Sequence, residues 1–214
     1  MGMLVLYCNS KRFVPIVTSQ AGSCLTYQDW INAKIDLGAF YLDTLLIKPG
    51  LNVLQTCENI RQYCPWPGKI ILNVSRLNNI LHGYYELRSP YDGTTIKITV
   101  VELWEIIFQL QADYLVVTQD CILHINGERY GKSNWWESDT PASDARSGNI
   151  YSNHGCLNLL DLKYQEDFSL LAEDCSCFTC YNGYTRAYLH YILQYVPLLA
   201  QRLLILHNIS YLGG

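Results

Sequence analysis

Residues 174–208 read DCSCFTCYNGYTRAYLHYILQYVPLLAQRLLILHN, and they contain the densest chemical signal in the chain. Three cysteines, Cys175, Cys177 and Cys180, fall within six residues, and a C-x-C-x-x-C turn can bring its three thiols to one side of a tight loop. A structural zinc ion takes four tetrahedral ligands, often three thiolates and one histidine. The pattern therefore predicts a zinc site, with either His207 or His190 as the fourth ligand.

Two other interpretations of the same cysteines remain open. Cys177 and Cys180 also have the C-x-x-C spacing of a redox pair, which would need a preceding strand and a helix that starts within the motif. The third cysteine and the acidic residues Glu173 and Asp174 suit that chemistry less well. The three residues could also be ordinary buried cysteines, although such close spacing favours metal binding.

The elements around the cluster predict an α/β protein. Two helices are expected after it, over residues 184–195 and 197–212, with Pro197 in the first turn of the second. Before residue 120, strands and helices alternate, which is typical of parallel βα units. We expect strands at 13–17, 39–47, 69–74 and 114–118, helices at 26–38, 51–63 and 100–112, and a hairpin that turns at Asp92-Gly93.

The later part of the chain is expected to change character. Residues 126–155 are rich in Gly, Ser, Asn and Asp and are predicted to form a loop, and one or two strands are expected from residue 156. We therefore predict two domains, a βα region over residues 1–155 and a C-terminal subdomain over residues 156–214.

Composition narrows the class of protein. Half of the 214 residues are apolar and 16% are charged, which is typical of a globular chain. The net charge is −4 and no basic run is present, so composition gives no support for a nucleic-acid partner. No signal peptide and no membrane-length apolar run is found, and we expect a cytoplasmic protein with no membrane partner. The nine cysteines are then expected to be thiols or metal ligands.

The C-terminal stretch resembles the zinc-binding segment of tRNA-guanine transglycosylases, which exchange a guanine in a tRNA anticodon region for a 7-deazaguanine base. The matching residues are Thr185-Arg186-Ala187-Tyr188-Leu189-His190, Gln201-Arg202-Leu203 and His207-Asn208. Residues 14–54, 86–121 and 145–171 resemble further segments of the family in the same order. The resemblance implies one structural Zn²⁺, held by Cys175, Cys177, Cys180 and His207.

The same resemblance implies a shortened barrel. Family enzymes are TIM-type (β/α) barrels with a zinc-bearing insertion, and they are much longer than this chain. Their central strands and their glycine-rich base-recognition loop have no counterpart here. The expected fold is therefore a shortened or incomplete TIM-type barrel with a C-terminal zinc-binding helical subdomain.

The positions that carry the family's chemistry are changed. Glu137 falls where the family has its nucleophilic aspartate, and Asp139 lies two residues further on, which is the wrong spacing. Asn73 and Gln119 fall at two carboxylates that bind the base. An amide offers one acceptor where a carboxylate offers two. Arg146 matches an arginine that contacts tRNA.

Each of these residues also has an interpretation without a functional role. Glu137, Asn73 and Gln119 could be ordinary polar groups of loops or strand ends, and Arg146 a surface charge. The pair Trp135-Trp136 could stack on a base or serve as a hydrophobic anchor, and the anchor is favoured.

Three functions fit this pattern. In the first, the protein is a catalytically inactive relative that pairs with tRNA or with a full-length transglycosylase, and we expect it to form oligomers. In the second, it is an active base-exchange enzyme that uses Glu137. In the third, it is a scaffold for protein contacts only. The first is favoured, because the zinc segment is retained while the base-binding positions are altered.

Overall fold

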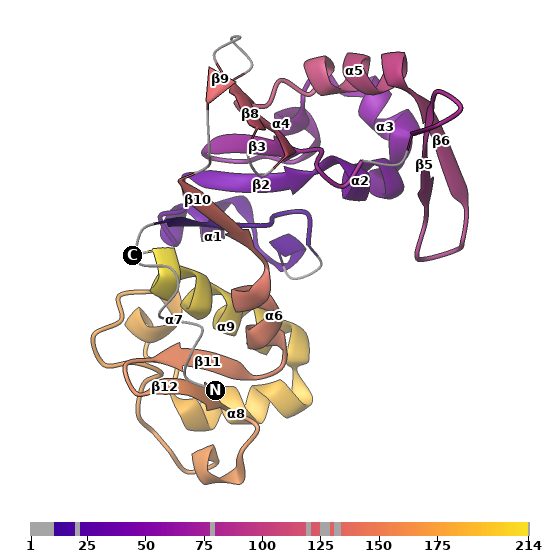
Figure 1. Ribbon diagram of the computed structural model, residues 1–214. Coiled ribbons are helices and arrows are strands. Elements are labelled where there is room, and N and C mark those ends of the chain that lie inside the picture. The colour runs from indigo at the N-terminus through magenta and orange to yellow at the C-terminus, as the bar shows by residue number, and fades with distance from the viewer. Residues whose placement is uncertain are drawn as a thin grey trace. The chain divides into compact units, whose positions relative to one another are not determined.

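The computed structural model describes residues 11–19, 22–77, 80–118, 121–124, 129–130 and 134–213. The chain divides into two compact units (Figure 1). We call Leu37–Asn134 the continuous unit, and the combination of Met1–Asp36 with Trp135–Gly214 the split unit. The division expected at residue 155 stays a prediction.

The continuous unit is built on a five-stranded sheet. Its strands are β2 (Leu37–Tyr41), β3 (Lys69–Asn73), β7 (Tyr114–Thr118), β8 (Cys121–His124) and β9 (Arg129–Tyr130), in that order. The pairs β2–β3 and β3–β7 are parallel, whereas β8 and β9 run antiparallel to their neighbours. Every residue of β2 is buried, as expected for a parallel strand that is covered on both faces.

The remaining elements of this unit flank the sheet. The helical segments are α2 (Leu42–Leu45), η2 (Leu46–Gly50), α3 (Leu51–Thr56), α4 (Ile60–Tyr63) and α5 (Val100–Gln109). A second sheet consists of β4 (Ile80–Leu81), β5 (Tyr84–Arg88) and β6 (Thr95–Thr99). The predicted hairpin about Asp92-Gly93 is confirmed by the antiparallel β5–β6 pair, and the helix predicted after it by α5, which starts in a Thr99–Glu102 capping box.

Two expected elements near residue 40 are present but end earlier than predicted. The first helix ends at Asn32 rather than at Gly38, because Lys34 adopts a left-handed φ of 56° and turns the chain. The strand expected over 39–47 is β2 followed by α2, since a short apolar run does not distinguish a buried strand from a buried helix.

The split unit combines both ends of the described chain. Its elements are β1 (Arg12–Pro15), η1 (Gly22–Cys24), α1 (Tyr27–Asn32), β10 (Trp135–Ser138), α6 (Thr140–Arg146), β11 (Asn149–Ser152), β12 (Gly155–Asn158), η3 (Leu162–Tyr164), α7 (Phe178–Tyr181), α8 (Arg186–Tyr195) and α9 (Pro197–Gly213). Strands β1 and β10 pair in parallel, and β11 and β12 form an antiparallel hairpin.

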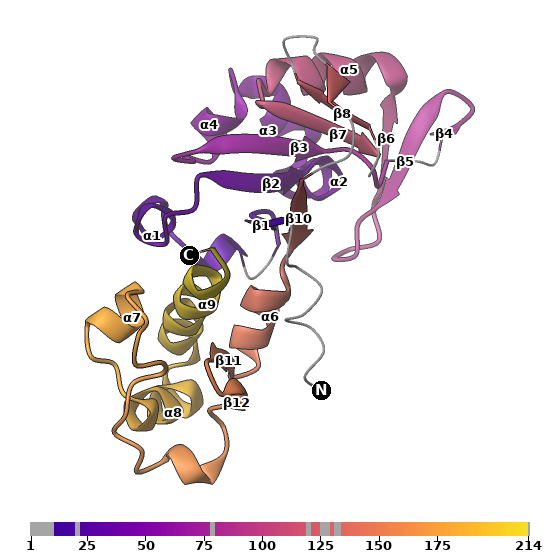
Figure 2. The same ribbon diagram turned by 60° about the vertical axis from the view of Figure 1, so that its left-hand side comes forward.

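Helix α9 forms the centre of this unit. All residues from Leu203 to Ile209 are buried, as expected of a helix that is surrounded by other elements. It packs against α6, α7, α8, β1 and β11, and Figure 2 shows α6 and α8 beside it. The two helices predicted after the cysteines are confirmed by α8 and α9.

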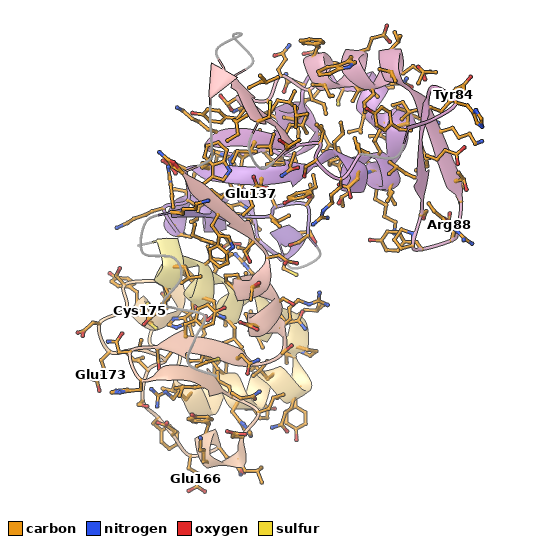
Figure 3. All side chains as sticks on the ribbon, viewed as in Figure 1. Tyr84, Arg88, Glu137, Glu166, Glu173 and Cys175 are labelled. Atoms are coloured by element: carbon orange, nitrogen blue, oxygen red, sulfur yellow. The ribbon has the colours of Figure 1, made fainter. Side chains whose placement is uncertain are left out.

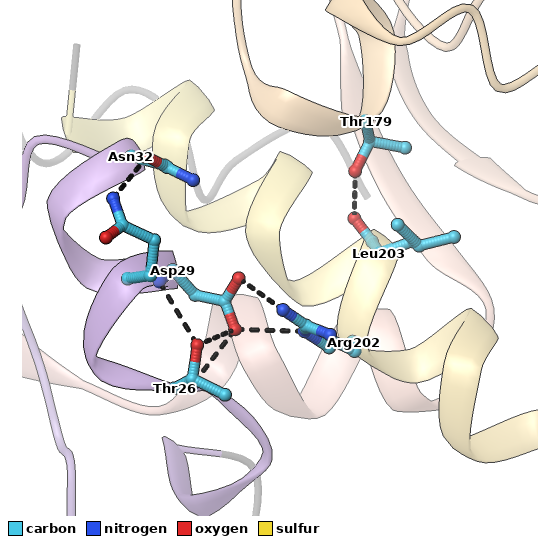
Figure 4. A network of polar contacts seen from close by, with 7 residues as sticks. Thr26, Asp29, Asn32, Thr179, Arg202 and Leu203 are labelled. Carbon is cyan, nitrogen blue, oxygen red and sulfur yellow. Dashed lines mark hydrogen bonds and ion pairs between the residues drawn. The ribbon is translucent and has the colours of Figure 1, made fainter.

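An ion pair attaches the N-terminal segment to α9 (Figure 4). The guanidinium of Arg202 donates to both carboxylate oxygens of Asp29 on α1, at 2.9 and 2.8 Å. The Asp29 carboxylate also accepts hydrogen bonds from the N–H and hydroxyl of Thr26, which caps the helix. Asp29 is only 2% exposed, so this contact is part of the core of the split unit.

The loop expected over residues 126–155 is wrong for its second part, because β10, α6 and β11 lie there. Their polar residues make local contacts that a composition-based assignment overlooks. The hydroxyl of Ser138, for example, accepts the N–H of Thr140 at 3.0 Å where α6 begins.

The α/β class is thus confirmed. Within the described ranges, the sheets have two, two, five and three strands, and none closes into a barrel. No helix in that part of the chain has the length and apolar character needed to cross a membrane.

Candidate metal centre

Four side chains converge between α7 and α9. Cys177 precedes α7, where its sulfur accepts the N–H of Cys180 at 3.4 Å, and His207 projects from α9. Cys175, labelled in Figure 3, lies on the loop that leads to α7. The Nδ1 atom of His207 is 3.7 Å from Sγ of Cys175, 3.4 Å from that of Cys177 and 3.5 Å from that of Cys180.

These separations fit one tetrahedral metal ion. A zinc ion about 2.3 Å from sulfur and about 2.0–2.1 Å from nitrogen places the sulfur and nitrogen about 3.5 Å apart. The observed distances lie around this value, and all four ligand atoms are within 4.8 Å of one another. Cys175, Cys177, Cys180 and His207 are therefore positioned to bind a metal ion.

The other ring nitrogen of His207 sets the tautomer. Nε2 lies 2.7 Å from the backbone carbonyl oxygen of Tyr151, and the ring is fully buried. With a metal ion bound, a proton on Nε2 would satisfy that carbonyl and the lone pair of Nδ1 would be available to the ion, as in many metal-binding histidines.

His190, the rival ligand, is engaged elsewhere. Its Nδ1 is 2.7 Å from the carbonyl oxygen of Leu159, and its Nε2 is 2.8 Å from the side-chain nitrogen of Gln194. Both ring nitrogens are thus used within the core. Of the two alternatives left open by spacing, the structure brings only His207 to the cysteines.

Hydrogen bonds within the cluster shift the pKa values of its members in different directions. Hydrogen bonds from Cys177 and His207 outweigh burial and lower the pKa of Cys180 to about 4. Burial works against a charged His207, but its hydrogen bonds with Cys175 and Cys180 raise its pKa to about 9. The hydrogen bond with Cys180 and burial raise the pKa of Cys177. A divalent cation binds sulfur ligands as thiolates, so its binding would release the remaining protons of the cluster.

Glu137 lies on β10, opposite Val14 of β1, and is half-buried (Figure 3). Its Oε1 accepts a hydrogen bond from the indole of Trp135 at 3.0 Å. Trp136 packs on Phe13, with the ring centroids 5.7 Å apart. The tryptophan pair is therefore in contact with its own unit. Asp139 is exposed and directly precedes α6.

The remaining predicted residues do not gather at the metal centre. Asn73 is buried at the end of β3, in the continuous unit, and its Oδ1 accepts hydrogen bonds from the N–H and hydroxyl of Ser75, at 3.0 and 2.7 Å. Arg146 is exposed in the last turn of α6, where a helix dipole favours a cation. Gln119 lies outside the described residues.

Two residues beside the cluster, Tyr151 and Asn208, had no predicted role. Asn208 was visible only as the neighbour of a proposed ligand. Tyr151 contributes backbone atoms, which leave no signal in a sequence.

The chain matches both a protein-family model and individual known proteins. The family model described as queuine tRNA-ribosyltransferase matches residues 135–214. The queuine tRNA-ribosyltransferase of Caldanaerobacter subterraneus is 43% identical over 72 residues, which cover 34% of this chain and 19% of that protein. The protein of the same name from Buchnera aphidicola is 37% identical over 71 residues, covering 33% and 19%. These shorter matches span only a small part of each relative.

A third relative extends the similarity to most of the chain. The queuine tRNA-ribosyltransferase of Blochmanniella floridana is 38% identical over 313 residues, which cover 94% of this chain and 83% of the relative. Because that alignment is longer than the 214-residue chain, part of the relative has no counterpart here. The resemblance seen in the sequence is confirmed, and the chain belongs to the queuine tRNA-ribosyltransferase family.

Proposed function

We propose that this protein is a zinc-stabilised, catalytically inactive transglycosylase-like subunit that binds tRNA or a full-length transglycosylase in 7-deazaguanine tRNA modification. The observation that carries the proposal is the contrast between two sets of residues. The four metal-binding side chains are assembled in a geometry that suits zinc. The positions expected to handle the base, Asn73 and Gln119, hold amides in place of carboxylates.

Zinc is the metal that best suits the ligand set. Three thiolates and one imidazole at tetrahedral separations are typical of structural zinc sites, whereas magnesium and calcium prefer oxygen ligands. All four coordination positions are taken by protein atoms, so the ion would supply folding stability, with no open position for a substrate.

An incomplete (β/α) barrel is part of the proposal. The parallel order β2–β3–β7 and the parallel pair β1–β10 are the kind of pieces from which such a barrel is built. After β7, the antiparallel β8 takes the place where a further parallel strand would pair. The unmatched part of the Blochmanniella relative also supports a loss of central segments.

Inactivity is supported by the changed polar groups. The side-chain oxygen of Asn73 is occupied by Ser75, and an amide cannot accept two N–H groups of a purine edge as a carboxylate does. Glu137 is longer than aspartate by one methylene. A displacement of the reacting group by about 1 Å can lower a rate about a hundredfold.

The five-stranded sheet is open, and a partner is one way to cover the edge of such a sheet. Oligomers and a cytoplasmic location, where tRNA is found, belong to this proposal. A scaffold without tRNA is the version favoured by the acidic net charge of −4.

One observation favours an active enzyme as the second candidate. Glu137 lies near the carboxyl end of a parallel strand, which is where βα folds place their catalytic groups. In this version Glu137 attacks the ribose carbon and guanine leaves.

Metal analysis, a tRNA binding assay and a base-exchange assay test the proposal together. We expect one zinc per chain, binding to tRNA or capture of a full-length transglycosylase, and no incorporation of labelled guanine into tRNA. Incorporation by the wild type that Glu137→Gln abolishes would establish the second candidate. Zinc without either binding partner would favour the scaffold.

A further inference from the structure

Two consecutive residues of α9 hold one residue of the β11–β12 hairpin. His207 Nε2 lies 2.7 Å from the carbonyl oxygen of Tyr151, and the side-chain oxygen of Asn208 accepts the backbone N–H of Tyr151 at 3.0 Å. His207 and Asn208 are both fully buried. The backbone of Tyr151 is therefore fixed on both sides, once through a metal-binding residue and once through its neighbour.

The amide of Asn208 extends this contact to a second element. Its Nδ2 donates to the carbonyl oxygen of Pro141, in the first turn of α6, at 3.0 Å, and to that of Asn149, at the start of β11, at 2.9 Å. One buried side chain thus makes three hydrogen bonds to backbone atoms of α6 and β11. Each group would be costly to leave unpaired inside the protein.

The segment held in this way directly follows Glu137. The backbone of Ser138 accepts the N–H of Ile16 at 3.3 Å, and its hydroxyl starts α6. The position of α6 therefore bears on the end of β10, where Glu137 lies.

We propose that Asn208 is a positioning residue that couples the metal centre to residues 138–152. The ring of His207, which would be held by a metal ion on Nδ1, contacts Tyr151, and Asn208 holds Tyr151 together with Asn149 and Pro141. Groups that orient a metal ligand typically contribute about 10–100-fold to metal affinity. Because binding linkage is reciprocal, a metal ion that binds more tightly when α6 and β11 are ordered would in turn stabilise their ordered state.

The first test concerns the effect of Asn208 on metal affinity. Competition with a chromophoric chelator measures the zinc affinity of the wild type and of Asn208→Ala. We expect a loss of about 10–100-fold. Arg202→Gln is the matched control, because Arg202 lies on the same helix in a comparable polar contact but points to α1. We expect its zinc affinity to equal that of the wild type. An equal affinity of Asn208→Ala and wild type would overturn the coupling.

The second test concerns the effect of the metal on α6 and β11. It uses hydrogen exchange of the wild type, so it does not depend on whether a variant folds. After zinc is removed with a chelator, exchange should accelerate by a larger factor for amides of α6 and β11 than for those of α1. Unchanged exchange in α6 and β11 would overturn the proposal, as would an equal increase in α1. The inference rests on zinc binding and not on tRNA. If the wild-type protein binds no zinc, the proposed coupling is wrong, whatever the result of the tRNA assay.

Discussion

His207 shows how one side chain combines ligation and packing. One ring nitrogen faces three sulfurs and the other meets the carbonyl of Tyr151, while the whole ring is buried. A solvent-exposed cysteine cluster would leave its fourth ligand free to rotate. Here the helix and the hairpin fix the imidazole before a metal arrives, which lowers the entropy that binding must overcome.

Replacing one ligand tests the centre at this scale. Cys177→Ser should abolish stoichiometric zinc and cause the split unit to unfold at a lower temperature, because binding to such sites supplies roughly 10–16 kcal/mol in isolated zinc-binding peptides. Metal analysis and calorimetry measure both effects. Cys156→Ser is the control, since Cys156 is exposed on β12 and takes no part in the cluster. Equal zinc content in both variants would contradict the assignment.

Asp29 predicts a dependence of stability on pH. Burial raises its pKa, but hydrogen bonds from Arg202 and Thr26 outweigh burial and leave the pKa below its ordinary value. A lowered folded-state pKa means that the stabilisation is complete above the pKa of the unfolded chain, about 3.9, and is lost as the pH falls through the folded value.

Arg202→Gln should therefore cost roughly 1–3 kcal/mol at neutral pH, where it leaves a buried carboxylate without its cation. The difference from the wild type should shrink below about pH 4, as Asp29 becomes protonated. Urea unfolding at a series of pH values measures this. A difference that stays constant from neutral to acidic pH would show that the ion pair is not its source.

At the scale of elements, the helices and strands that can be recognised from their own residues were predicted well. Helix α5 lies where the apolar spacing of its own residues places it, and strand β7 coincides with the short apolar run over residues 114–118. The segment over residues 135–152 was missed. Its elements are only four to seven residues long, and their stability comes from contacts with α9 and β1 that no local window contains.

Helix α8 offers a test of local capping. The hydroxyl of Thr185 accepts the N–H of Tyr188 at 3.2 Å, which satisfies one of the free N–H groups at the start of the helix. Thr185→Ala should reduce the free energy of unfolding by about 1 kcal/mol. Thr185→Ser keeps the hydroxyl and should lose far less. Denaturant unfolding measures the free energy of unfolding of both variants. An equal decrease in the two would show that the Thr185 hydroxyl does not stabilise the helix.

For the whole molecule, the sequence predicted the α/β class, the metal cluster and the family. It did not predict that residues 1–36 belong with residues 135–214. Strand β1 pairs with β10 more than a hundred residues later, and Asp29 meets Arg202 across a separation of 173 residues. The residues around a parallel strand or a charged side chain do not identify its distant partner. Spacing alone also left both His190 and His207 as candidates. The structure resolves this, because His190 is hydrogen-bonded to the carbonyl of Leu159 and His207 lies beside the cysteines.

The grouping of the split unit predicts the behaviour of fragments. Residues 135–214, the part that the family model matches, should be less stable alone than together with residues 11–36. Alone, β10 lacks its parallel neighbour and α9 lacks the partner of Arg202. Thermal unfolding of zinc-loaded 135–214, with and without the added peptide 11–36, measures the difference. Identical melting curves would show that the N-terminal segment is dispensable.

The split unit also has a consequence for biosynthesis. The continuous unit consists of one uninterrupted stretch, so it can fold while later residues are still being translated. The N-terminal segment, by contrast, must wait for β10 and α9 to leave the ribosome. The three thiols emerge before His207, and until α9 follows they are an incomplete chelate on a nascent chain. Binding of a metal ion by all four residues therefore has to wait until α9 has been translated.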